Sequence, residues 1–131
     1  MFGSDQIKSI TVVIADPAAD NKQIHLWKAP NECTILSANI VCQNAQGAGS
    51  AGSFALHNFG TAGTAVGGTV AAALGGTAAA SRLSASTPAA YTISDGYLED
   101  GEWLVLDYQE VGDWVEQNVS ITWDYVTGKG S

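Results

Sequence analysis

Polar and apolar residues alternate along several short stretches of the chain, which is the spacing of a β-strand with one face in water. The clearest stretch is residues 119–125. Its large apolar residues fall on one face of the predicted strand: Val119, Ile121, Trp123 and Tyr125. Ser120, Thr122 and Asp124 occupy the other face. The pattern predicts a half-buried strand that places Trp123 in the core.

A second strand, at residues 103–108, is apolar on both faces over its first half. Leu104 and Leu106 share one face, and the opposite face begins with Trp103 and Val105. An apolar residue on the outer face of a sheet needs cover of its own. We therefore expect a second packing surface at Trp103 and Val105, such as a neighbouring subunit.

Four further strands are predicted upstream. They are rich in β-branched or aromatic residues and bounded by Pro, Gly, Asn or Asp. They cover residues 7–15, 23–28, 34–43 and 54–59. Alternation places His25 and Trp27 on the same face of residues 23–28. Alternation also puts Leu36 on one face of residues 34–43, together with Ala38, Ile40 and Cys42.

Residues 44–90 hold nine of the fifteen glycines and no acidic residue. Such a composition can mark a flexible linker. Against that, Phe54, Leu56, Val70 and Leu74 recur at intervals that short strands with glycine turns could use. We interpret the segment as closely packed strands and loops of small residues.

The number of predicted strands and the lack of an amphipathic helix predict an all-β chain. We expect a single-domain antiparallel β-sandwich or jelly roll. At 131 residues the chain is long enough to bury one core without disulfides or metals. We expect a flexible lead at residues 1–6, a domain at 7–126 and a flexible tail at 127–131.

The two cysteines, Cys33 and Cys42, lie nine residues apart on one predicted strand. That spacing separates their Cα atoms by roughly 30 Å and turns the side chains to opposite faces, whereas a disulfide needs about 7 Å or less. We expect two free thiols, with Cys42 packed as an apolar residue. There is no Cys-x-x-Cys spacing and no signal sequence, so we expect no zinc site and a protein that stays in the reducing cytoplasm where it is made.

The formal net charge is -8, and residues 91–131 carry nine acidic residues against one lysine. Such a surface repels nucleic acid, and no apolar run is long enough to cross a membrane. The histidines, His25 and His57, stand in separate strands without a nucleophile motif. The carboxylates between Asp95 and Glu102 do not follow a calcium-loop spacing. We therefore expect no enzyme activity, cofactor or metal.

Tryptophans are the remaining candidate binding residues, because aromatic side chains anchor protein interfaces and also stack on sugars. With Trp123 assigned to the core, Trp27, Trp103 and Trp114 are the possible contact residues. Together with Val105, they form the candidate interface with a neighbouring subunit or another protein.

Three segments resemble the small jelly-roll decoration (cement) proteins on the heads of tailed bacteriophages. They are residues 27–36, residues 98–107 and the closing strand at 119–123, with the Gly/Ala/Thr-rich segment between the first two. The similarity covers residues 7–125 as a pattern of strands and turns. Related jelly rolls also occur in head fibres and in tail or baseplate components.

The resemblance implies a homotrimer that sits on the capsid surface of a virion and ties major capsid protein subunits together. A nearly charge-free 44–90 segment and the apolar Trp103 and Val105 would suit such an interface. A carbohydrate-binding jelly-roll module, serving in a head fibre or tail, is the alternative. A cupin-like metal enzyme is a third reading, which two histidines in separate strands do not support.

Overall fold

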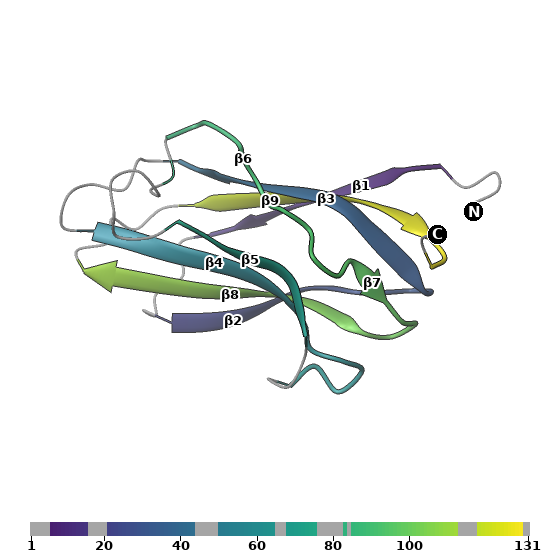
Figure 1. Ribbon diagram of the computed structural model, residues 1–131. Helices are drawn as coiled ribbons and strands as arrows, with labels where there is room; N and C mark the ends of the chain where they lie inside the picture. Colours follow the sequence, from purple (N-terminus) through teal and green to yellow (C-terminus); the bar gives the residue numbers. More distant parts are fainter. Residues whose placement is uncertain are drawn as a thin grey trace.

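The structure is a computed structural model in which two antiparallel sheets pack face to face (Figure 1). It describes residues 6–15, 21–43, 50–64, 68–75, 83, 85–112 and 118–129. Residues 1–5 of the expected lead and 130–131 of the expected tail lie outside this description.

The described residues form nine strands, two of them only two residues long. Sheet A has the order β1-β9-β3-β6, with β7 also pairing with β3, and sheet B has the order β2-β8-β4-β5. The strands are β1 Lys8–Ile14, β2 Asn21–Lys28, β3 Cys33–Cys42, β4 Ser50–Asn58, β5 Thr69–Gly75, β6 Ala89–Ala90, β7 Tyr97–Leu98, β8 Trp103–Gly112 and β9 Val119–Thr127.

The strand pairing is that of a long hairpin rolled up on itself. The first strand pairs with the last, β2 with β8, β3 with β6 and β4 with β5. The pairs β3·β9 and β4·β8 then join these hairpins into two sheets. This is the arrangement of a jelly roll, so the predicted fold class is confirmed. In the glycine-rich segment the described residues include β4, β5 and β6, in agreement with the strand interpretation.

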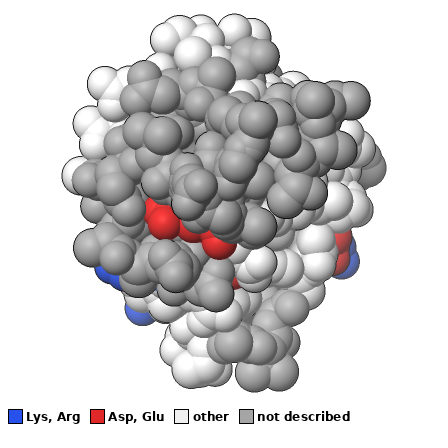
Figure 2. Space-filling model, turned by 90° about the vertical axis from the view of Figure 1, so that its left-hand side faces the viewer, with Lys and Arg blue, Asp and Glu red and all other residues white. Residues whose placement is uncertain are grey.

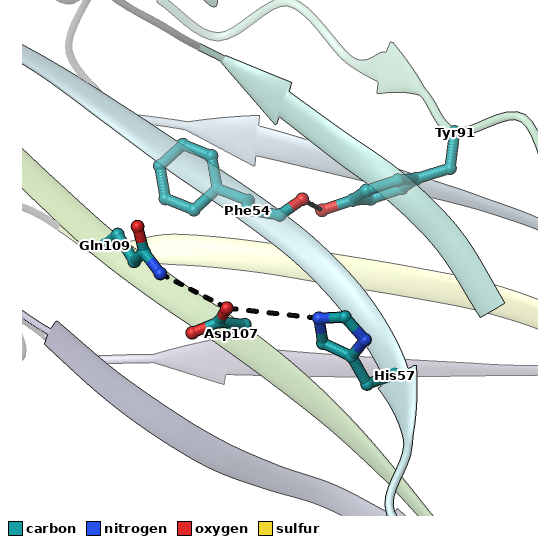
Figure 3. Close-up of polar contacts among 5 residues, drawn as sticks. All are labelled: Phe54, His57, Tyr91, Asp107 and Gln109. Carbon is teal, nitrogen blue, oxygen red and sulfur yellow. Dashed lines mark hydrogen bonds and ion pairs between the residues drawn. The ribbon is translucent and has the colours of Figure 1, made fainter. Parts of the chain in front are cut away.

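The core lies between the two sheets. Trp123 of β9 has no exposed surface, as predicted, and its largest fully buried companions are Tyr108 and Phe54 from sheet B. Tyr91, just after β6, ties the layers together: its hydroxyl donates a hydrogen bond of 2.9 Å to the Phe54 carbonyl oxygen (Figure 3). Its backbone N–H donates one to the Ala38 carbonyl oxygen, also at 2.9 Å.

A β-bulge in β3 overturns one of the sequence predictions. The register between β3 and β9 shifts between Ile35 and Ser37, so Leu36 is an extra residue without a partner on β9. A bulge of this kind reverses the side-chain phase of the strand beyond it. Leu36 is consequently 40% exposed, and Ile35 and Ala38 both face the core. The predicted placement of Leu36 with Ala38 was wrong.

The same bulge brings both cysteines to the core face. Cys33 and Cys42 are free and buried, which confirms the predicted thiols but corrects their predicted placement on opposite faces. Desolvation by burial raises the pKa of each thiol from 9.0 to about 11. A buried thiol with a raised pKa has little thiolate and is chemically inert.

We expect neither Cys33 nor Cys42 to react with a disulfide reagent at pH 8 until the protein unfolds. Since the unfolded thiols lose their protons near pH 9 and the folded ones near pH 11, the folded state binds more protons in between. The free energy of unfolding should therefore fall as the pH rises from about 9 to 11. Urea titrations at pH 7, 9 and 11 measure this.

A variant in which both cysteines are replaced by alanine is the matched control. It should lose less stability between pH 9 and 11 than the natural sequence does, although Tyr91, whose burial also raises its pKa, still contributes to the fall. An identical pH dependence in the two proteins would contradict the assignment to the thiols.

Candidate interaction surfaces

The outer face of sheet B carries a small apolar cluster that is separate from the core. Val105 of β8 has 0% exposure and lies between His25 of β2 and His57 of β4 in one cross-strand row. Phe59, which follows β4, is also buried but does not belong to the core cluster. These residues and the half-buried Trp103 are named here the outer cluster.

The turn at residues 59–64 covers the outer cluster. The His25 Nε2 atom lies 2.6 Å from the Gly63 carbonyl oxygen, and the His25 and Trp103 rings meet edge to face with centroids 5.3 Å apart. A Cβ atom on Gly63 would stand 3.0 Å from Trp103 Cδ1. The second packing surface that the sequence required is therefore supplied by the chain itself. Val105 offers no surface to a partner, and Trp103 keeps partial exposure.

His57 of the outer cluster lies beside a carboxylate (Figure 3). His57 Nε2 is 3.9 Å from Asp107 Oδ2, and the Gln109 side chain donates to that carboxylate at 3.3 Å. The His57 ring also stacks on Phe59 with centroids 5.8 Å apart. Because both cysteines are buried in the core, neither thiol can join this pair as a nucleophile.

Trp27 does not lie on the same face of sheet B as His25, where the alternation placed it. The β2 register shifts between His25 and Trp27, which is the mark of a bulge, and Trp27 then points toward sheet A. Its ring is 5.8 Å from that of Trp123 and 4.7 Å from that of Tyr125, centroid to centroid. The prediction that His25 and Trp27 share a face was wrong, because the bulge separates them.

Trp27 belongs to a stripe of half-buried apolar side chains, which we call the seam. The seam runs where the core meets solvent beside β1 and β2, and Lys8 of β1 lies over the Tyr125 ring, 6.0 Å from its centroid. Its apolar members are only partly buried although they pack on the core: Ile10, Val12, Ile24, Leu26, Trp27 and Tyr125.

The outer face of sheet A is lined by small hydroxyl side chains. Thr11 and Thr122 share a hydrogen bond of 2.8 Å across β1 and β9. The Asp124 carboxylate accepts hydrogen bonds from Ser9 and from Ser37, the latter at 3.2 Å. Val13 at the end of this face is 62% exposed. The side chains named on this face include one charge, Asp124, which the hydroxyl groups hold.

A cavity of about 420 Å³ opens beside the 59–64 turn, lined by residues that include Asn58, Thr61 and Glu102. Asn58 donates to Glu102 Oε1 at 3.0 Å, and the Glu99 backbone N–H donates to the same oxygen at 2.7 Å. Neither Trp27 nor Trp103 lines this cavity. The two tryptophans lie on opposite sides of sheet B, so they do not form one stacking platform. Trp114 lies outside the described residues.

Within the described ranges, no three His, Cys, Asp or Glu side chains gather closely enough to hold a metal ion. No helix among those residues is long and apolar enough to span a bilayer. Figure 2 views the end of the sandwich where β8 ends and β4 begins; carboxylates lie near its middle and basic residues at its rim. Asp95, Glu99 and Asp100 are exposed elsewhere on the surface.

No protein-family model and no curated protein matches this chain. Its fold is similar to that of a chain in the capsid asymmetric unit of cyanophage Pam1, with a TM-score of 0.60 and 10% sequence identity, over 95% of this chain and 86% of that one. A chain of infectious bursal disease virus, Gx strain, matches with a TM-score of 0.46 and 16% identity over 97% of this chain and 34% of that one. At these identities the likeness is one of fold.

Proposed function

We propose that the protein is a non-enzymatic structural component of a virion, a decoration or cement protein on the capsid surface. It binds the outer surface of the major capsid protein lattice as a homotrimer and stabilises the head. The observation that carries this proposal is the match in fold, over almost the full length of both chains, to a chain of the cyanophage Pam1 capsid asymmetric unit. Assembly takes place in the host cytoplasm, in keeping with two free thiols.

The two half-buried tryptophans supply the contact residues of the proposal. Trp27 on the seam and Trp103 in the outer cluster are each partly exposed, and the ring of each packs against neighbouring rings. Aromatic anchors of this kind concentrate binding energy at protein interfaces. Trp114 remains a candidate from the sequence. Val105 stabilises the outer cluster from inside and contributes no contact of its own.

Binding to undecorated heads of the same virus tests the proposal. We expect saturable binding, with bound trimers, and heads that release their genome at a higher temperature. Trp27→Ala or Trp103→Ala should weaken binding at least tenfold, whereas Leu36→Ser, which changes an exposed residue away from both tryptophans, should bind normally. Absence of saturable binding by the natural sequence would overturn the proposal.

A carbohydrate-binding role, in a head fibre or tail, is the second candidate function. The cavity beside the 59–64 turn favours it, because Asn58, Thr61 and Glu102 could hydrogen bond to sugar hydroxyls there. A glycan array and a titration of tryptophan fluorescence separate the two functions. A cement protein should give no signal in either measurement. A glycan-binding module should give a signal on the array, and a fluorescence change as well if the sugar reaches a tryptophan.

A further inference from the structure

The strands at sheet edges differ in how they are protected against pairing with another chain. An edge strand exposes unpaired backbone N–H and C=O groups, and proteins protect such edges with lysines, bulges or very short strands. In sheet B, β2 carries Lys22, Lys28 and a bulge, and the pairing of β5 with β4 is irregular at two places. In sheet A, β6 and β7 are two residues long.

Among the described residues, the remaining edge, β1, has only one of these devices, a lysine at its start. All seven of its residues keep an unbroken register with β9, and Lys8 at its start is its one charged residue. Its side chains leave apolar surface open on both faces of the sheet, since Val13 is 62% exposed and Ile10 and Val12 are only partly buried in the seam. β1 is thus a regular and partly apolar template for one more strand.

We propose that β1 pairs with β1 of a second copy of this chain, antiparallel and about a two-fold axis at Thr11. The sequence of the strand is complementary to itself in this register. Thr11 faces Thr11, which is a favourable cross-strand pair. In each of the other pairs the two residues lie on the same side of the sheet. Ile10 pairs with Val12 on the seam side, Ser9 with Val13 on the outer side, and Lys8 with Ile14 at the ends.

Charge favours the antiparallel arrangement with a second copy. It places the two Lys8 side chains at opposite ends of the ladder, roughly 20 Å apart along the strands, where salt screens their repulsion. A parallel pair would set them side by side. The nearest carboxylate on the outer face, Asp124, is on β9 and is already held by Ser9 and Ser37. The two hydroxyl-lined faces then join into one sheet.

The seven-residue ladder is small beside the 1,200–2,000 Å² that stable interfaces bury, so the isolated pair should be weak, with a dissociation constant between about 10 μM and 1 mM. On a particle that displays many copies, a weak contact becomes effective by avidity. The pair does not depend on the proposed virion role. If the protein is a trimer, it joins one trimer to the next.

Opposite charges at the two-fold axis test this register. Thr11 is exposed, and Thr11→Lys and Thr11→Glu each set like charges against one another only in the proposed pair. We expect sedimentation and light scattering to show two-fold association for the natural sequence, at least tenfold weaker association for either variant alone, and a 1:1 pair when the two variants are mixed. Gln23→Lys, on the β2 edge, is the matched control and should associate normally.

The variant Thr11→Cys tests the same register without adding a charge, in case the charged variants do not fold. Mild oxidation of Thr11→Cys should give a disulfide dimer, because residues directly opposite in an antiparallel pair have Cα atoms about 4.5–5.5 Å apart. Cys33 and Cys42 are buried and do not compete.

Two results would overturn the pairing: a natural sequence in which the β1 amides that point away from β9 exchange freely at about 1 mM, or association that Thr11→Lys leaves unchanged. A trimer that forms equally well with Thr11→Lys, without any two-fold contact, would refute the β1 pair and leave the decoration role standing.

Discussion

Trp123→Ala should lower the free energy of unfolding by about 3–5 kcal/mol, the cost of removing a large aromatic side chain from a core. Trp123 has 0% exposure and lies on β9, between β1 and β3, with its neighbours Ile10 and Ala38 on those strands. Its ring also contacts that of Trp27 across the sandwich. The cavity left by alanine would open beside both sheets. Urea denaturation followed by circular dichroism measures the loss.

Trp123→Phe is the matched control. The Trp123 Nε1 atom is buried and has no hydrogen-bond partner among the described residues, and an unsatisfied buried donor costs about 1–3 kcal/mol. Phenylalanine removes that donor while it keeps an aromatic ring. Its net cost should therefore be about 1–2 kcal/mol, well below that of alanine. Equal losses for the two variants would show that volume is not what Trp123 contributes.

Gly75→Ala should cost about 3 kcal/mol or more. Gly75 ends β5 with φ of +91°, where a residue with a Cβ atom is strained by about 1–2 kcal/mol. The added Cβ would also stand 2.2 Å from the Gly52 carbonyl oxygen of β4, which is backbone and cannot rotate away. Overpacking of that kind adds about 1–3 kcal/mol. Thermal and urea unfolding of the variant measure the sum.

Gly60→Ala separates the two causes. Gly60 has φ of +67°, but a Cβ atom there would meet nothing within 4 Å. We expect that variant to lose only about 1–2 kcal/mol, from backbone strain alone. Gly68→Ala, with an ordinary φ and open space, should be close to neutral. If Gly75→Ala cost no more than Gly60→Ala, the close contact between β5 and β4 would not be rigid.

Most of the sandwich could be predicted from the sequence, because a strand with one buried face has a period of two that needs no knowledge of its partners. The strand at residues 119–125 and the core position of Trp123 follow from that period alone. Strand order does not, since it depends on which edges meet in three dimensions. The jelly-roll arrangement therefore became visible only in the pairing.

The misplaced residues share one cause. Leu36 and Trp27 each lie at a bulge, where an extra residue reverses the side-chain phase. Alternation cannot reveal this, because both phases of residues 34–43 contain apolar side chains. The conflict itself was visible, because strict alternation places either Leu36 or Ile35 on the outer face. The structure buries Ile35, Ala38 and Ile40, which requires a change of side-chain phase between Ile35 and Ala38.

The interface role of Trp27, Trp103 and Trp114 stays a prediction. Trp103 and Val105 indicated a second packing surface on the outer face of sheet B, and the chain itself buries Val105, with the 59–64 turn packed on His25 and Trp103. After Phe59 the turn consists of small residues without a hydrophobic period, so the sequence gives no sign that this part packs on anything. The seam and the free edge of β1 were missed for a different reason: both depend on which strands lie at the edges.

The partnership of β1 with β9 has a consequence for how the chain acquires its structure. Thr11 and Thr122, neighbours across that pair, are 111 residues apart in sequence. Because β9 also separates β1 from β3, β1 cannot take its place in the sheet until β9 has left the ribosome. Topologies dominated by such distant pairings fold in milliseconds to seconds. Until β9 arrives, β1 has no partner in its own sheet, so we expect the yield of folded protein to depend on chaperones and on the rate of synthesis.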